Sequence, residues 1–133
     1  MRHLITYAAT FAIFAVLDLI WLGLVAKDLY RSQLSGLMAE RLNLPAAAAF
    51  YLLYALGLSL FVVAPALQSG TWKAACLWGA LFGLVAYATY DLTNLATLKG
   101  WSVTIVVADI VWGIVISASA ATASYFVTRA MTH

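Results

Sequence analysis

Charged residues are scarce in this sequence. Only 9% of its 133 residues are charged, whereas 65% are hydrophobic. A soluble domain has about a quarter charged residues and under half apolar ones. The polar side chains are therefore too few to cover a water-soluble globule of this size, and the sequence predicts an integral membrane protein. The formal net charge of +2 is too small and too scattered to indicate a nucleic-acid partner.

Cysteine and histidine are almost missing. Cys76 is the single cysteine, so an intramolecular disulfide is excluded, and its apolar surroundings predict an inert, buried thiol. His3 and His133 lie at the ends of the sequence, which argues against a histidine-ligated haem, zinc or di-iron centre within the membrane and against a serine–histidine triad. There is no phosphate loop or dinucleotide-binding glycine pattern. No metal and no cofactor is expected.

Long hydrophobic runs make up most of the chain. Four apolar segments cover about residues 4–26, 46–67, 72–98 and 101–127. Each reaches the ~20 residues that a helix needs to cross a ~30 Å hydrocarbon core. They are too long and too continuously apolar for barrel strands. We therefore predict an all-α integral membrane protein, a four-transmembrane-helix bundle with a single membrane domain over residues 1–133.

The connections between these segments differ in length. Residues 68–71 and 99–100 form tight turns, whereas the first loop is long. Apolar residues recur at helical spacing within that loop, with charged and polar residues between them, so we predict a short amphipathic helix over about residues 29–43 in the headgroup region. An ordinary polar loop is the alternative. Pro45 suits the start of the second span, where its missing N–H is not needed.

The N-terminal segment is interpreted as a retained helix. Its apolar run is longer than the ~7–15-residue core of a signal peptide and contains Asp18. Four Lys and Arg residues on the first and third loops face three on the opposite side. Under the positive-inside rule this small excess favours both termini outside, and the near balance also leaves insertion in both orientations open.

Three carboxylates interrupt the apolar spans: Asp18, Asp91 and Asp109. No Lys, Arg or His lies at comparable depth in the sequence to neutralise them. An aspartate at the centre of a membrane helix costs about 2.5–3.5 kcal/mol on insertion scales, so such residues are normally turned inward, paired or placed on a wet pathway. These positions are the first candidates for a functional site.

Two of the aspartates share a local pattern. Asp18 is followed three residues later by Trp21, and Asp109 by Trp112, so each pair lies on one helix face. The antiparallel arrangement of the first and fourth spans brings Asp18 and Asp109 to similar depth. We predict that these carboxylates share one proton and that an indole N–H donates to the ionised partner. The structural alternative is that each aspartate only fixes helix register.

The third aspartate lies in the most polar stretch of the chain, near the end of the third span. Tyr90 precedes Asp91, and Asn94 follows one helical turn later, so that Asp91 and Asn94 are expected to face a ligand together. Four-residue steps along this helix join Gly79, Gly83, Tyr87 and Asp91. The glycines favour close helix packing. All three aspartates therefore predict a polar cavity in the half of the bilayer next to the first and third loops, unless Asp91 simply marks a helix end that reaches water.

The sequence resembles a known family. The likeness rests on Asp18-x-x-Trp21, on the stretch YDLTNLATLKGW at residues 90–101 and on Asp109-x-x-Trp112. These features resemble the predicted bacterial inner-membrane proteins of domain-of-unknown-function family 2177. The resemblance implies a multi-pass protein of the bacterial inner membrane and implies no particular activity.

Function therefore has to be inferred from the residues. The leading interpretation is a small membrane carrier or ligand-binding protein whose carboxylate cluster titrates during its cycle, acting on a polar or lipid-like ligand. One alternative is a membrane-embedded enzyme acting on a lipid or isoprenoid, with an aspartate as general acid or base. Another is an accessory membrane subunit. Membrane lipids and a small polar or amphipathic ligand are the expected partners, and a homo-oligomer is also compatible with the sequence.

Overall fold

The computed structural model describes residues 2–25, 27–34 and 43–132, and this part of the chain is helical with short connections. The elements in order are α1 (Arg2–Ile20), the π-helical turn η1 (Trp21–Val25), α2 (Lys27–Leu34), α3 (Leu44–Leu58), the π-helical turn η2 (Ser59–Val63), α4 (Ala64–Ser69), α5 (Trp72–Thr97) and α6 (Val103–Met131). No strand occurs in the described ranges, so the predicted all-α class is confirmed.

Four helical segments are long and apolar enough to cross a membrane. They run over Arg2–Leu24, Leu44–Ser69, Trp72–Thr97 and Val103–Met131, which confirms the four predicted spans. The boundaries shift by a few residues because of local capping. The Asn43 side chain accepts a hydrogen bond from the Ala46 amide, so the second span begins two residues early, at Leu44. Ser102 caps the fourth span in the same way, and that helix begins at Val103 instead of Trp101.

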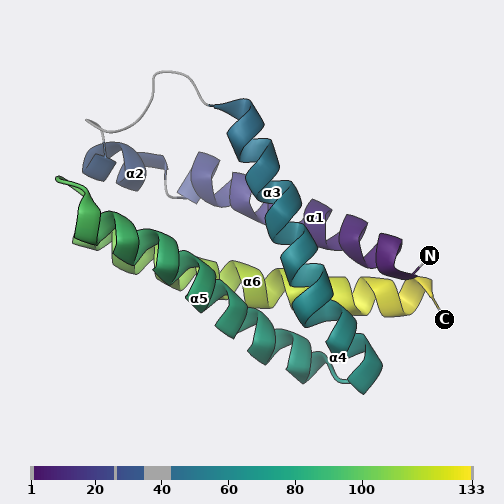
Figure 1. Cartoon of the computed structure of the whole chain (residues 1–133). Helices are drawn as coiled ribbons and strands as arrows, with labels where there is room; N and C mark the ends of the chain where they lie inside the picture. Colours follow the sequence, from purple (N-terminus) through teal and green to yellow (C-terminus); the bar gives the residue numbers. More distant parts are fainter. Residues whose placement is uncertain (1, 26, 35–42, 133) are drawn as a thin grey trace.

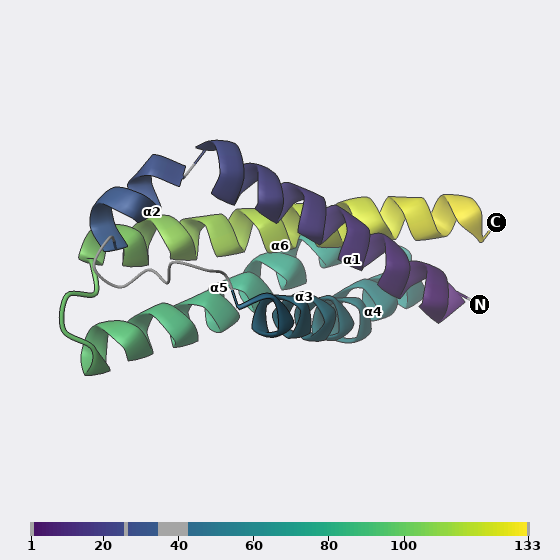
Figure 2. The same cartoon turned by 90° about the horizontal axis from the view of Figure 1, so that it is seen from above.

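The helices form one bundle whose two chain ends lie together. Figures 1 and 2 show α5 and α6 side by side and antiparallel, with α1 on another side of α6, while α3 and α4 cross the bundle obliquely. The N-terminus and the C-terminus are at the same end, as four crossings require. The tight turns bend through glycines with positive φ, Gly70 (74°) and Gly100 (77°).

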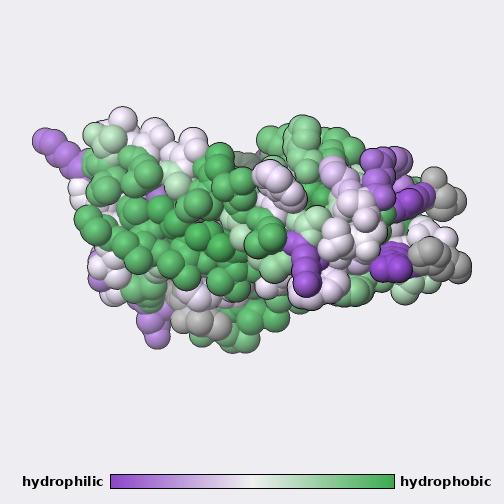
Figure 3. All heavy atoms as spheres, turned by 90° about the horizontal axis from the view of Figure 1, so that it is seen from below, coloured by the Kyte–Doolittle hydropathy of each residue, from purple (hydrophilic) through white to green (hydrophobic). Residues whose placement is uncertain are grey.

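The outer surface is hydrophobic, as a lipid-facing surface must be. Leu24 and Phe61 are 81% and 72% exposed, and many other leucines and valines point outward. Figure 3 shows a broad hydrophobic region over one face, while hydrophilic atoms gather toward the ends of the bundle. This distribution suits a multi-pass membrane protein.

The predicted loop helix is present in part. α2 covers Lys27–Leu34, with Asp28 in its first turn. Its Gln33 is tied to the start of α6, because the Ser102 hydroxyl donates to Gln33 Oε1 at 2.6 Å. Most of the remainder of the predicted segment, residues 35–42, lies outside the described residues, and Asn43 is not helical but caps α3.

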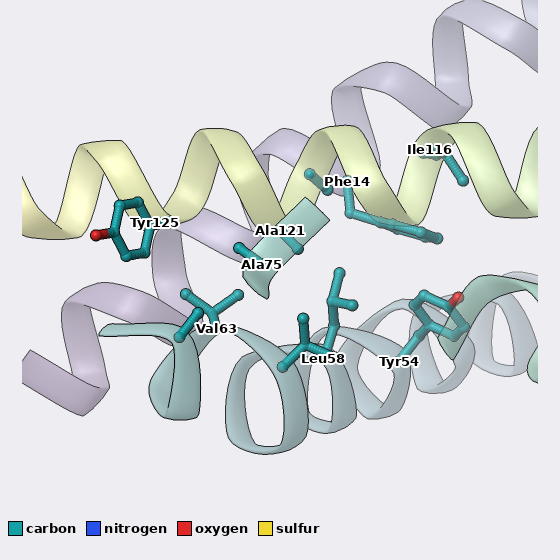
Figure 4. Packing of buried hydrophobic residues seen from close by; sticks show 11 residues of the cluster. Phe14, Tyr54, Leu58, Val63, Ala75, Ile116, Ala121 and Tyr125 are labelled. Carbon is teal, nitrogen blue, oxygen red and sulfur yellow. The ribbon is translucent and has the colours of Figure 1, made fainter. Parts of the chain in front are cut away.

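The hydrophobic core lies between α6 and the helices around it. Phe14, Leu58, Val63 and Ile116 are fully buried there, and Figure 4 shows them with Ala75, Ala121 and Tyr125 between the facing helices. The second span passes this core through the π-helical turn η2, just before Pro65. A proline inside a helix has no N–H to donate and crowds the carbonyl four residues earlier, and the wider π-helical turn accommodates both effects.

Glycine sets the distance between α5 and α6. A Cβ added at Gly79 would lie 2.9 Å from the Ser117 carbonyl oxygen, and one at Gly83 would overlap the Gly113 carbonyl. One turn further along, Gly113 leaves room for the Tyr87 ring. Because the two helices are antiparallel, each step of four residues forward on α5 corresponds to a step of four residues backward on α6. The predicted packing role of Gly79 and Gly83 is confirmed. The same steps place Tyr87 level with Asp109, and Asp91 one turn beyond that level.

Buried hydroxyl pairs add specific ties between the spans. Thr10 Oγ1 on α1 and Ser124 Oγ on α6 lie 2.7 Å apart. Tyr54 Oη on α3 and Ser117 Oγ on α6 lie 2.6 Å apart. Both pairs hydrogen-bond across helices, where each such contact contributes on the order of 1 kcal/mol in a membrane. Together with the glycine ladder they fix the register of α6 against its neighbours.

The glycine ladder predicts a position-specific effect of adding a methyl group. Gly83→Ala should lower the stability of the detergent-solubilised protein by about 1–3 kcal/mol, because the added carbon meets backbone on α6. Gly23→Ala is the matched control, since nothing lies within 4 Å of a Cβ there. It should be neutral or slightly stabilising. Thermal unfolding followed by circular dichroism measures both, and equal melting temperatures for the two variants would contradict the close packing.

Candidate functional site: an acidic cavity inside the bundle

A cavity of about 570 Å³ opens inside the half of the bundle next to α2. Residues from all four spans line it: Asp18, Trp21, Leu22, Phe50, Tyr54, Ala86, Tyr87, Tyr90, Asp91, Trp101, Ile105 and Asp109. Its volume falls within the range of about 300–1,000 Å³ that is usual for small-molecule sites. The lining combines three carboxyl groups with six aromatic rings and contains no Lys, Arg or His among the described residues.

Asp18 is held by two donors from different helices. The Tyr51 hydroxyl of α3 donates to Asp18 Oδ2 at 2.6 Å, and the Trp112 Nε1–H of α6 donates to Asp18 Oδ1 at 3.0 Å. Asp18 is only 6% exposed. Each oxygen of this carboxylate therefore has its own partner, as a buried carboxylate requires. The expectation that an indole donates to one of the aspartates agrees with this geometry.

The two Asp-x-x-Trp patterns meet each other in space. The Trp21 and Trp112 rings stack, with centroids 4.6 Å apart and planes at 7°. Trp21 begins the π-helical turn η1, and Leu22 of the same turn also lines the cavity. Such turns widen a helix locally and are frequent at functional sites. The stacked indoles thus hold α1 to α6 at the level of Asp18.

Asp91 lies beside Asp109 at the end of the α5–α6 glycine ladder. Asp91 is fully buried, and neither of its oxygens has a hydrogen-bond donor. This unsatisfied buried carboxyl is the most unusual polar group in the described part of the chain.

An indole donor and a phenol complete this corner of the cavity. Trp101 lies beside Asp91, and its Nε1 is buried with no hydrogen-bond partner. The Tyr90 ring packs edge-on against Trp101, with centroids 5.8 Å apart at 83°. The Trp101 side chain and the Asp91 carboxyl therefore lie next to each other in the lining of the same cavity.

The structure brings together most of the predicted site residues. Asp18, Trp21, Tyr87, Tyr90, Asp91 and Asp109 line the cavity. The other two, Trp112 and Asn94, do not line it. Trp112 donates a hydrogen bond to Asp18, and Asn94 lies against the Tyr90 side chain. Asp18 and Asp109 share the cavity as expected, but Asp91 lies directly beside Asp109, which the depth argument did not foresee. A shared proton in this group stays a prediction.

Sequence reasoning missed the contribution of the second span. Phe50 and Tyr54 line the cavity and Tyr51 bonds Asp18, all three from α3. A signal was available, because phenol groups within a hydrophobic span need a polar partner. Trp101 was also missed as a site residue, because the sequence marked it only as the start of the fourth span.

These features define a class of protein: a four-span helical membrane protein with an acidic, aromatic cavity in one half of the bundle. The chain belongs to domain-of-unknown-function family 2177, described as predicted membrane proteins, whose family model matches residues 3–126. The predicted family membership is thereby confirmed. No curated protein matches the chain, and no solved structure does so.

The hydrogen bonds to Asp18 predict an energetic coupling. Tyr51→Phe should destabilise the protein by about 1–3 kcal/mol, because it leaves a buried carboxylate oxygen without its donor. In an Asp18→Asn background the same change should cost markedly less, since the pair acts as a unit. Tyr7→Phe is the control, because that hydroxyl donates to the Leu52 carbonyl at an exposed position. Additive effects in the double-mutant cycle, measured by melting in detergent, would rule out the coupling.

Proposed function

We propose that this protein is a small carrier or ligand-binding protein of the bacterial inner membrane, and that its cavity takes an amphipathic organic cation. The observation that carries the proposal is the buried Asp91 carboxyl, which has no donor for either oxygen and lies beside a second carboxyl. A protonated or quaternary amine would place a positive charge next to the Asp91 carboxyl.

The aromatic side chains that line the cavity favour a cationic ligand over a neutral polar one. Trp21, Tyr54, Tyr90 and Trp101 present rings to the same space as the aspartates. Aromatic faces attract organic cations, with about 0.5–2 kcal/mol for each well-placed ring. The rings also give apolar area against which alkyl or aryl substituents can pack.

The residues favour an organic cation over a metal ion. Within the described ranges, no group of three His, Cys, Asp or Glu side chains converges to hold a metal. Hard cations require several oxygen ligands around one point. Here the carboxyls are distributed, with Asp18 already bonded to Tyr51 and Trp112, and Asp91 is the one whose oxygens have no donor among the described residues.

A proton exchange follows from this arrangement. When the cavity is empty, Asp91 and Asp109 share one proton, because two adjacent carboxylates away from water do not both ionise. An entering monovalent cation replaces that proton, which is released, so the net charge of the site is unchanged. Other titratable side chains that face the pair are Asp18, Tyr54, Tyr87 and Tyr90, and no basic side chain lines the described cavity. Binding should therefore tighten as the pH rises.

An enzyme that acts on a lipid or isoprenoid would use the same carboxyl as a general acid or base. The two functions differ in the fate of the ligand. A carrier returns its ligand unchanged, whereas an enzyme converts it. Mass spectrometry of the small molecules recovered after incubation with the purified protein separates them.

Two ions of nearly identical shape and opposite charge test the proposal. Tetraphenylphosphonium should bind the detergent-solubilised protein in isothermal titration calorimetry, and tetraphenylborate should not. Asp91→Asn should weaken tetraphenylphosphonium binding by about tenfold or more, or ~1.4 kcal/mol. Runs in buffers of different ionisation enthalpy should report the release of close to one proton in the wild type.

Asp28→Asn is the matched control, because this aspartate is exposed on α2, outside the cavity. It should bind the cation like the wild type. The proposal fails if the borate binds as well as the phosphonium, or if Asp91→Asn and Asp28→Asn bind it equally.

A further inference from the structure

A second cavity lies at the opposite end of the bundle, where the two chain ends meet. Its volume is about 620 Å³, and it is lined by residues that include Arg2 and Ile5 of α1, Leu67 of α4, and Tyr125, Arg129 and Thr132 at the end of α6. This cavity shares no residue with the acidic one. Figure 1 shows the N- and C-terminal ends of α1 and α6 close together there, and Figure 3 shows hydrophilic atoms gathered toward that end.

The charged side chains that the structure describes at this end of the bundle are all basic. Arg2 and Arg129 line the cavity, and Lys73 lies at the same end on the first turn of α5. The four aspartates that the structure describes, Asp18, Asp28, Asp91 and Asp109, all belong to the opposite half. The guanidinium groups around this cavity therefore have no carboxylate among the described residues to neutralise them, and the cavity is positive.

Arg129 is positioned by its neighbour. Its Nη1–H donates to the Tyr125 hydroxyl at 3.1 Å, and its guanidinium carbon lies 6.0 Å from the centre of the Tyr125 ring. Tyr125 itself is only 1% exposed, so it is a fixed support. A guanidinium held in this way presents its remaining N–H groups as a fork that matches the oxygens of a phosphate.

The side of this cavity that α1 and α4 form adds groups that favour a ligand with a negative head and an apolar body. Arg2 opens α1, whose first-turn backbone N–H groups have no partners within the helix and carry the positive end of the helix dipole. Ile5 and Leu67 give the cavity an apolar wall directly below the arginines. A ligand that suits both parts has an anionic head and an apolar body.

We propose that this cavity binds the phosphate group of an anionic membrane lipid, with Arg2 and Arg129 holding the phosphate and Ile5 and Leu67 contacting the start of its acyl chains. The depth agrees, because the ends of membrane helices lie at the level of the headgroups, and basic pockets between spans are suited to lipid phosphates. The alternative, in which each arginine merely extends to the membrane surface, does not account for two arginines from opposite chain ends around one cavity.

Native mass spectrometry in detergent tests the proposal with two lipids that differ only in their headgroup. Phosphatidylglycerol should bind about fivefold or more tightly than phosphatidylcholine with the same acyl chains. Arg2→Gln and Arg129→Gln should each reduce phosphatidylglycerol binding to the level of phosphatidylcholine. Arg129→Lys keeps the charge without the fork and should recover part of the binding.

Lys73→Gln is the matched control, because it removes one positive charge from the same end without touching the cavity. It should keep the full preference for phosphatidylglycerol. An equal loss in Lys73→Gln, or an unchanged preference in both arginine variants, would overturn the site. Circular dichroism melting of each variant verifies that it is folded.

A thermal-shift titration with inorganic phosphate distinguishes a lipid from a soluble ligand. Free phosphate at matched concentration should stabilise the protein far less than phosphatidylglycerol. If phosphate stabilises it equally, and Arg2→Gln and Arg129→Gln abolish the effect, the anion site stands but the lipid assignment is wrong. Neither outcome depends on the acidic cavity, so the two proposals succeed or fail separately.

Discussion

The close contact between α5 and α6 is the constraint on which the rest of the structure depends. Gly79, Gly83 and Gly113 remove the side chains that would separate the two helices, and backbone meets backbone along several turns. An antiparallel pair so close has one register. Near the end of this contact Asp91 lies beside Asp109, although a membrane interior would otherwise keep two carboxyls apart. Packing energy of apolar and small residues thus offsets the cost of an acidic site.

The sequence predicted the spans and the acidic positions well, because twenty-residue hydrophobic runs and charges within them are strong signals. It predicted less well which acidic residues meet. The depth argument joined Asp18 to Asp109, but depth does not determine which helices are neighbours. The four-residue steps on α5, read together with Asp109, Gly113 and Ser117 on α6, place Tyr87 level with Asp109 and Asp91 only one turn further along. Tyr51 and Tyr54 were missed because the oblique crossing of α3 cannot be read from its own hydrophobicity.

The two halves of the bundle have opposite characters. One half holds three aspartates among aromatic rings, and the other holds two arginines beside an apolar wall. Under the two proposals, a lipid phosphate at the arginines would fix the depth of the bundle in the bilayer, and the acidic cavity at the other end would exchange its ligand. The buried core of Phe14, Leu58, Val63 and Ile116 lies at the centre of the bundle, and none of these four residues lines either cavity.

The central claim is that Asp91 and Asp109 share one proton in the empty protein. Infrared difference spectroscopy across a pH titration measures this directly through the carboxylic acid C=O stretch. The account predicts one protonated carboxyl near neutral pH, whose band is displaced or lost in Asp91→Asn and also in Asp109→Asn, and which is unchanged in Asp18→Asn. A band that responds only to Asp18→Asn, or no protonated carboxyl at pH 7, would contradict the account.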